Sequence, residues 1–253
     1  MSINEITLIN QASNLREQLG EDAFSPIDIF SLVQSIDTLT LILYPLGKNI
    51  SGVCYKGDSS SAIIINSDMS LGRQRFSLAH ELYHLFYDEA TKPTVSLEKI
   101  GSGGESEKKA DMFASYFLMP SAGLYKRIEK YKQKYGRNKL SIEEIIKWEQ
   151  YYGVSHQAML YRLQNEPSLH IYIDEEIKNV GVVSLAKSLG YSADLYLPSP
   201  KEKKILVLGH YVNQAKELLD QDKISCGKYE ELLLDAFRED IVYGSEEEEY
   251  SFD

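Results

Sequence analysis

Two histidines and a glutamate stand at the spacing of a metal-dependent hydrolase. The run His80-Glu81-Leu82-Tyr83-His84 has the pattern HExxH. In an α-helix, side chains four positions apart lie on one face, about 6 Å apart along the axis, so both imidazoles can reach one cation. Glu81 can then act on a water beside the cation without binding the metal. The pattern predicts His80 and His84 as ligands and Glu81 as catalytic base; the alternative is a pair of ordinary surface histidines.

A hydrolytic zinc site needs a third protein ligand from another element, because one helix face cannot surround an ion. Asp88 lies two turns beyond His80, roughly 12 Å along the axis, which makes it a poor candidate. Glu107 and Asp111 stand four apart and share a helix face. We expect Glu107 to bind the metal and Asp111 to accept the N–H of a ligating imidazole, with Glu105 as the competing ligand.

Two helices must position these side chains. Residues 71–87 have helical periodicity, with an apolar stripe made of Phe76, Ala79, Leu82, Tyr83 and Phe86. Residues 105–118 are helical until Pro120. The connection 91–104 is rich in glycine, and we expect it to be mobile. Whether this connection gates the cleft or is an ordinary surface loop stays open.

Three short segments rich in β-branched or aromatic residues precede the first of these helices. Residues 38–44, 52–55 and 61–65 predict an antiparallel meander. The segment 61–65 is either an edge strand that pairs with an extended substrate or an inner strand. Two packing helices are expected earlier in the chain, at 5–19 and 26–36.

Helices dominate the rest of the predicted fold. Ser141 and Ser155 are N-cap candidates of a helix-turn-helix-like pair, and a strand is expected at 169–173. Two amphipathic helices are predicted at 205–220 and 225–242. The fold class is α+β, with a zincin-like domain at 1–122, a helical segment at 123–167 and a mainly helical region with an acidic tail at 168–253.

Charge and composition narrow the location and the partners. The chain has 253 residues with 27 Lys and Arg against 38 Asp and Glu, a net charge of −11, which disfavours binding of polyanions by the whole surface. Cys54 and Cys226 lie far apart in sequence, which suits a reducing compartment. The first residues lack a signal-peptide pattern, and no apolar stretch reaches about 18 residues. We therefore expect a cytoplasmic protein without a membrane segment.

Three stretches together resemble the ImmA/IrrE family of metallopeptidases. They are residues 75–84 (RFSLAHELYH), residues 107–114 (EKKADMFA) and residues 118–120 (LMP). The resemblance implies His80, His84 and Glu107 as ligands of one zinc ion, with Mn²⁺ or another divalent metal as the alternative, and Glu81 as the base. Asp111 stands where the family commonly has Asn, which removes no required function.

The resemblance also implies a substrate, because characterised members of the family cleave a helix-turn-helix repressor and so relieve repression of a mobile element or a stress response. A different hypothesis is DNA binding by the helix pair 141–165, which follows the basic run 126–139 in the sequence. In that case Arg162 and Gln157 would contact the bases. We expect direct DNA binding to be absent. A third is partner binding without turnover, against which the intact Glu81 argues. The oligomeric state stays open.

The residue that stabilises the oxyanion also stays open. Its candidates are Tyr116, Tyr125, Arg75 and His156.

Overall fold

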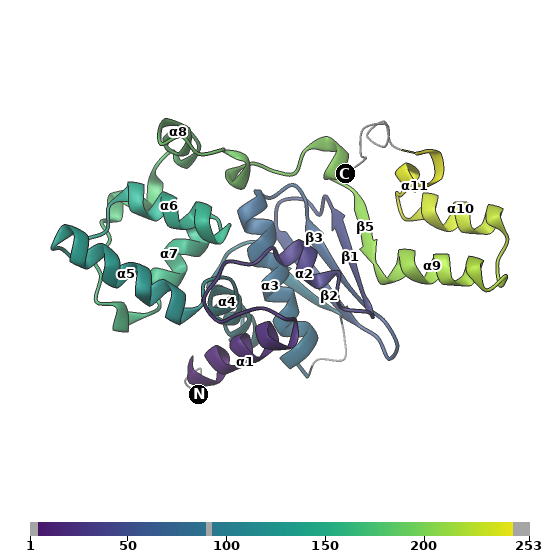
Figure 1. The fold of residues 1–253 in the computed structure, drawn as a ribbon, viewed down its shortest axis with the longest axis horizontal. Coiled ribbons are helices and arrows are strands. Elements are labelled where there is room, and N and C mark those ends of the chain that lie inside the picture. The colour runs from purple at the N-terminus through teal and green to yellow at the C-terminus, as the bar shows by residue number, and fades with distance from the viewer. Residues whose placement is uncertain (1–4, 90–92, 245–253) are drawn as a thin grey trace.

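A mixed five-stranded sheet forms the centre of the molecule in the computed structural model, which describes residues 5–89 and 93–244 (Figure 1). Its strands are β1 (Leu39–Tyr44), β2 (Ile50–Lys56), β3 (Ser61–Asn66), β4 (Thr94–Leu97) and β5 (Leu206–Gly209). Their spatial order is β4-β2-β3-β1-β5. The α+β class predicted from the sequence is confirmed.

The predicted antiparallel meander is wrong. β2 pairs with β3 antiparallel, but β1 pairs with β3 in parallel and does not lie beside β2. The connection between β1 and β2 crosses the end of β3, where the Asn66 amide donates to the carbonyls of Gly47 and Ile50. β3 is therefore an inner strand with buried Ile63 and Ile65, and the edge strands of the described sheet are β4 and β5.

The C-terminal part of the chain returns to this sheet. Residues 206–209, predicted as the start of a helix, form β5 and pair antiparallel with β1, and helix α9 begins only at His210. Gly209 makes the turn with φ +82°, and a Cβ there would lie 2.6 Å from the carbonyl oxygen of Leu39. The strand predicted at 169–173 is absent from the described structure, where Tyr172 makes only an isolated bridge with Lys139.

The described helices surround the sheet on several sides (Figure 1). They are α1 (Glu5–Gln18), α2 (Ile29–Val33), α3 (Leu71–Tyr87), α4 (Glu105–Leu118), α5 (Ser121–Tyr135), α6 (Ile142–Tyr152), α7 (His156–Gln164), α8 (Val182–Ser188), α9 (His210–Asp220), α10 (Cys226–Asp235) and α11 (Glu239–Tyr243). α3 and α4 have the predicted bounds. α2 is shorter than predicted at both ends; the backbone before it contacts Arg75, which donates to the carbonyl of Ile27.

The core lies where α3 is enclosed by the sheet and by α4. Phe76, Leu78 and Leu82 of α3 are fully buried, as are Phe113 and Phe117 of α4, whose rings stack. The predicted helix pair is present as α6 and α7, and the side chains of Ser141 and Ser155 cap them by accepting from backbone N–H groups. Within the described residues, every helix is too short or too polar to span a bilayer.

Candidate metal centre

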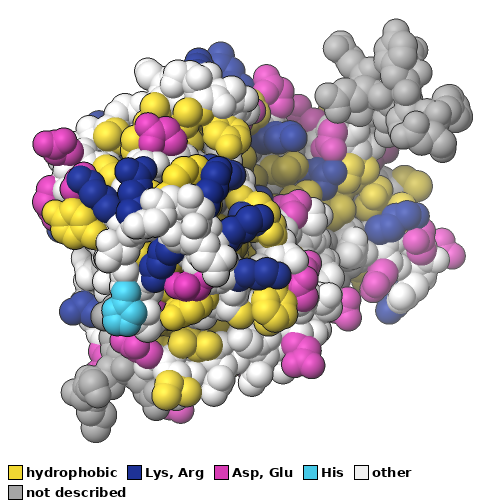
Figure 2. Space-filling model, turned by 60° about the vertical axis from the view of Figure 1, so that its left-hand side comes forward, with side chains coloured by type: hydrophobic (Ala, Val, Ile, Leu, Met, Phe, Trp, Pro, Cys, Tyr) yellow, Lys and Arg dark blue, Asp and Glu magenta, His cyan; other side chains and the backbone are white. Residues whose placement is uncertain are grey.

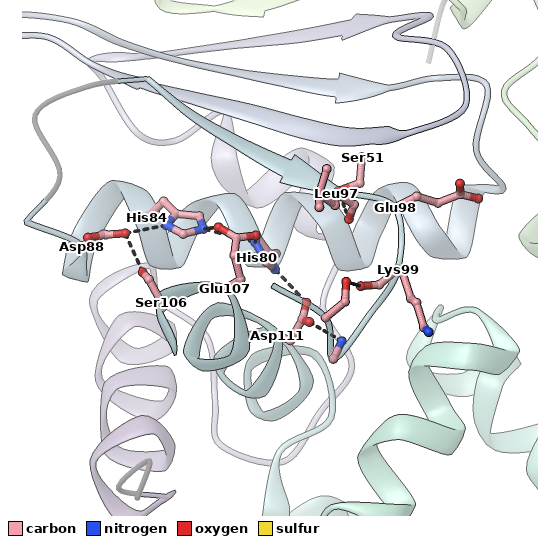
Figure 3. A network of polar contacts seen from close by, with 12 residues as sticks. Ser51, His80, His84, Asp88, Leu97, Glu98, Lys99, Ser106, Glu107 and Asp111 are labelled. Carbon is pink, nitrogen blue, oxygen red and sulfur yellow. Dashed lines mark hydrogen bonds and ion pairs between the residues drawn. The ribbon is translucent and has the colours of Figure 1, made fainter. Parts of the chain in front are cut away.

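Three donor atoms from α3 and α4 converge on one point (Figure 3). The Nε2 atoms of His80 and His84 lie 3.1 Å apart. Glu107 places its Oε2 atom 3.3 Å from Nε2 of His80 and its Oε1 atom 3.2 Å from Nε2 of His84. Ligand atoms about 2.1 Å from a tetrahedral ion lie about 3.4 Å from one another. The distances between these three donor groups are therefore close to those between three ligands of one zinc ion.

The other ring nitrogen of each histidine is held by a carboxylate. Nδ1 of His80 lies 2.8 Å from Oδ1 of Asp111, and Nδ1 of His84 lies 2.8 Å from Oδ2 of Asp88. A carboxylate accepts hydrogen bonds, so each Nδ1 donates its proton to Asp111 or Asp88, and each Nε2 is directed at the other imidazole and at Glu107. Two imidazole nitrogens and a carboxylate then face one another in a buried place, where either a shared proton or a metal cation stabilises them. The donor set therefore fits a divalent metal.

The charges at the centre follow the same logic. Burial lowers the pKa of His80, but hydrogen bonds with Asp111 and Glu107 outweigh it and raise the pKa to about 9. Burial raises the pKa of Glu107, yet its contacts with both imidazoles lower the pKa to about 2. Both shifts favour positive charge between the two imidazoles and Glu107, which is the charge that a metal ion supplies.

Glu81 lies on the sheet side of the same helix. It is fully buried, and neither carboxylate oxygen has a hydrogen-bond partner of ordinary geometry among the described residues. Burial raises the pKa of Glu81, and the nearby imidazoles and the Ser96 hydroxyl of β4 only partly oppose this. A Cβ on Gly52 would lie 2.6 Å from Oε1 of Glu81, so only glycine leaves room for the carboxylate against β2.

The connection between α3 and α4 fixes the site. Thr91 and Lys92 lie outside the described residues. Further along, the N–H of Gly101 donates to Oδ2 of Asp111 at 2.6 Å. Gly103 has φ +89°, and a Cβ there would lie 3.0 Å from the side chain of Glu107. These glycines position the ligand and its neighbour; whether the segment also gates the cleft stays a prediction.

The structure brings together His80, His84, Glu107 and Asp111 as predicted, and their chemical roles stay predictions. Glu105, the competing ligand, instead pairs with Lys109 at 2.8 Å on the surface. The sequence argument missed Asp88, which lies too far along the helix to share the metal with His80 but contacts the second ring nitrogen of His84.

Three of the four oxyanion candidates have partners elsewhere. Arg75 contacts Ile27 and Asp28, and the guanidinium of Arg162 covers the buried Tyr116 ring. The two ring nitrogens of His156 contact Glu149 and the carbonyl of Ile177. The fourth candidate, Tyr125, is 43% exposed on α5. The assignment of this role stays open among the four.

The fold and the site agree with a comparison against known families. The family model for peptidase M78, described as the IrrE N-terminal-like domain, matches residues 36–164, just over half of the 253-residue chain. The match spans the sheet from β1 to β4, both helices of the centre and the α6–α7 pair. A search of curated proteins found no match.

Proposed function

Because the chain belongs to the M78 family of peptidases with an IrrE N-terminal-like domain, we propose that it is a zinc-dependent endopeptidase whose substrate is a helix-turn-helix transcriptional repressor. The convergence of His80, His84 and Glu107 is the observation that carries the metal and the reaction. Two imidazoles and one carboxylate are a ligand set of catalytic zinc sites, which keep a further position open for the reaction.

Each residue of the centre has a distinct task in this proposal. Zinc, when bound, polarises the peptide carbonyl and makes a water more acidic. Glu81 takes the proton of the attacking water on its carboxylate and delivers it to the leaving amine. Asp111 and Asp88 hold the two imidazoles so that their Nε2 atoms keep facing the metal position.

The edge of the sheet supports cleavage of an extended segment. β4 is the outer strand beside β2, and Figure 3 shows it running along α3 above the two histidines. Val95 and Leu97 of this strand are 50% and 54% exposed. The outer backbone edge of β4, which pairs with no further strand in the described part of the chain, can pair with an extended substrate chain and lay it across the metal centre. The segment that is cut must therefore be a loop or linker of the repressor.

Charge supports the choice of a DNA-binding protein as substrate. The net charge of −11 attracts a basic partner and raises the rate of encounter with it. Such a repressor is met in the cytoplasm, which is the location that we propose. Cleavage would remove the repressor from its operator and change transcription of the genes that it controls.

Direct DNA binding by the helix pair has less support. Arg162, one of the two expected base readers, is 1% exposed and contacts Met119, Ser121 and Glu166. Figure 2 shows Lys and Arg side chains gathered on the face of the molecule that it presents. Several cations of the basic run 126–139 nevertheless have partners within the chain. Arg127 lies over the Tyr151 ring, and Lys139 pairs with Asp174.

The test compares the wild-type protein, Glu81→Gln and Glu105→Gln, each loaded with one zinc, against candidate helix-turn-helix repressors of the source organism. Mass spectrometry of the products locates new termini. We expect Glu81→Gln to cleave at least about 100-fold more slowly at unchanged zinc content, because general acid–base catalysis contributes that much. Glu105→Gln, which removes an exposed carboxylate outside the centre, should cleave like the wild type. Equal cleavage by all three proteins would rule out the proposed reaction.

A further inference from the structure

A cavity of about 860 Å³ opens beside the first turn of α3. Among the residues that line it are Lys48 from the β1–β2 connection, Arg73 from α3, Glu98 after β4, and Ser155 and Gln157 at the start of α7. None of these residues belongs to the metal centre. The cavity is nevertheless next to it, because α3 runs from the cavity to His80 and His84.

Arg73 is the unusual group in this cavity. Its side chain is buried, with 8% of the residue exposed, and Nη2 donates to the carbonyl of Glu98. Nε and Nη1 find no acceptor among the described residues. Burial lowers the pKa of Arg73 only to about 10, so the guanidinium is charged at neutral pH. Nε and Nη1 are themselves enclosed, and the charges of Asp111 and Glu98 act on the guanidinium, so an anion in the cavity would stabilise Arg73 by its charge in addition to these.

The N-terminus of α7 adds further donors at the same place. α7 has nine residues, and the Ser155 cap accepts only the N–H of Ala158. The first turn of α3 lies directly against it, since a Cβ on Gly72 would be 2.5 Å from the backbone nitrogen of Ser155. The positive end of a helix and the neighbouring guanidinium therefore lie on the same cavity. Lys48 is an exposed cation at its rim.

The spacing along α3 relates this cavity to the scissile bond. Arg73 and His80 are seven positions apart, so they share a helix face and lie about 10.5 Å apart along the axis. An extended peptide advances about 3.3 Å per residue, so this distance corresponds to about three residues. β4 leads the same way, because its last residue, Leu97, is followed by Glu98, whose carbonyl accepts from Arg73. A substrate paired with β4 thus reaches the cavity.

From this geometry we infer that the cavity is a specificity subsite, in which Arg73, Lys48 and the start of α7 bind the acidic side chain of a substrate residue about three positions from the scissile bond. The inference rests on the proposed peptidase function and adds the class of segment that is cut. A phosphorylated side chain offers the same anionic oxygens. Two carboxylates also line the cavity. The carboxylate of Asp68 is paired with Lys204 at 2.6 Å. The exposed carboxylate of Glu98 opposes binding of an anion.

The test uses zinc-loaded protein and a library of peptides made by tryptic digestion of a whole proteome, followed by sequencing of the new termini. The measured quantity is the ratio of Asp and Glu to Asn and Gln at each position around the cut. We expect a ratio of at least about ten at a position two to four residues from the bond, since hydrogen bonds to charged groups give about that selectivity. A second arm compares synthetic copies of one cleaved peptide with Glu, Gln or phosphoserine there.

Three variants separate the effects of the positive and the negative side chains of the cavity. Arg73→Gln should bring the ratio close to one, and Glu98→Gln should increase it. Lys48→Gln, at an exposed position where folding is not at risk, should lower the ratio several-fold. A wild-type protein that cleaves in a Glu81-dependent way without any acidic preference overturns this inference and leaves the proposed function standing. A wild-type protein that cleaves no peptide and no repressor overturns both.

Discussion

Two clusters of histidine and carboxylate among the described residues differ in one respect. In the metal centre, His80 and His84 each contact a carboxylate through Nδ1, and their Nε2 atoms converge with the carboxylate of Glu107 on one point. Between α6 and α7, His156 contacts Oε1 of Glu149 at 2.6 Å through Nδ1 and the carbonyl of Ile177 at 2.8 Å through Nε2. Glu149 also accepts from the hydroxyl of Tyr196 at 2.7 Å.

The difference shows what makes a histidine cluster a binding site. Both ring nitrogens of His156 face acceptors, so both must donate and the ring is protonated. This cluster is complete and joins α6, α7 and the segments at 175–179 and 194–196. In the metal centre, by contrast, two imidazoles and Glu107 direct their donor atoms at one shared point, where a divalent cation can replace the protons between them. Residue types are alike in the two places, and the convergence of three donor atoms on one point separates a ligand set from a structural contact.

The largest expected effect comes from a variant that disrupts only the cluster of His156 and Glu149. Glu149→Gln leaves a buried imidazolium without its counter-charge, and breaking a buried pair costs about 3 kcal/mol of unfolding free energy, at the lower end of the usual range because part of the His156 ring is exposed. Urea unfolding of the zinc-loaded protein measures this. Zinc content should stay at the wild-type value. Loss of zinc together with stability would show that the two clusters are not separate.

The next effect concerns the carboxylates that orient the ligands. Asp111→Ala should weaken zinc binding by about 100-fold and Asp88→Ala by about tenfold, measured by competition with a chelator. Asp111 is the buried partner, whereas the side chain of Asp88 is 19% exposed, so water can replace it more easily. Asp111→Asn, which keeps an acceptor, should lose less. Equal zinc affinity in Asp111→Ala and wild type would contradict the role of Asp111.

A smaller effect follows from the charge of His156. Burial lowers its pKa, but the hydrogen bond with Glu149, the charge of Glu149 and the Ile177 carbonyl together raise it above the ordinary value. Its stabilisation is therefore fully present below about pH 6.5 and is lost as the pH rises through the higher folded-state pKa, at no more than about 1.4 kcal/mol per pH unit.

Unfolding of zinc-loaded wild type and His156→Gln from pH 5.5 to 8.5 measures this dependence. The stability difference between the two proteins should shrink as the pH rises. A difference that grows with pH would mean that His156 is neutral in the folded protein.

The smallest effect comes from the glycines beside the metal centre. Gly103→Ala should weaken zinc binding, by less than about tenfold, because the backbone has φ +89° and the added Cβ presses on Glu107 at 3.0 Å. Gly104→Ala is the matched control, since a Cβ there meets nothing within 4 Å. Identical zinc affinities in both variants would show that the connection does not position Glu107.

Local patterns predicted the parts of the molecule that local physics determines. The helices at 71–87 and 105–118 have the expected bounds, because periodicity and Pro120 fix them within a few residues of sequence. Helical spacing also indicated which side chains share a face, and so grouped His80 with His84 and Glu107 with Asp111. The same spacing relates His84 to Asp88, four positions on, and could have identified this second contact.

Long-range pairing decided what local patterns could not. The apolar residues before His210 suit a helix as well as a strand, and only pairing with β1 makes 206–209 a strand. Likewise, the parallel pairing of β1 with β3 depends on a crossing connection held by Asn66. The cavity at Arg73 joins segments from 47 to 196, so no single stretch of sequence indicates it.

The central claim is that donor atoms converging on one point, and not histidine–carboxylate contacts as such, bind the metal. Zinc content measured by mass spectrometry of purified His84→Ala and His156→Ala tests it most directly, since each variant removes one imidazole that contacts a carboxylate. We expect about one zinc per chain in the wild type and in His156→Ala, and a large loss in His84→Ala. Undiminished zinc in His84→Ala would contradict the claim.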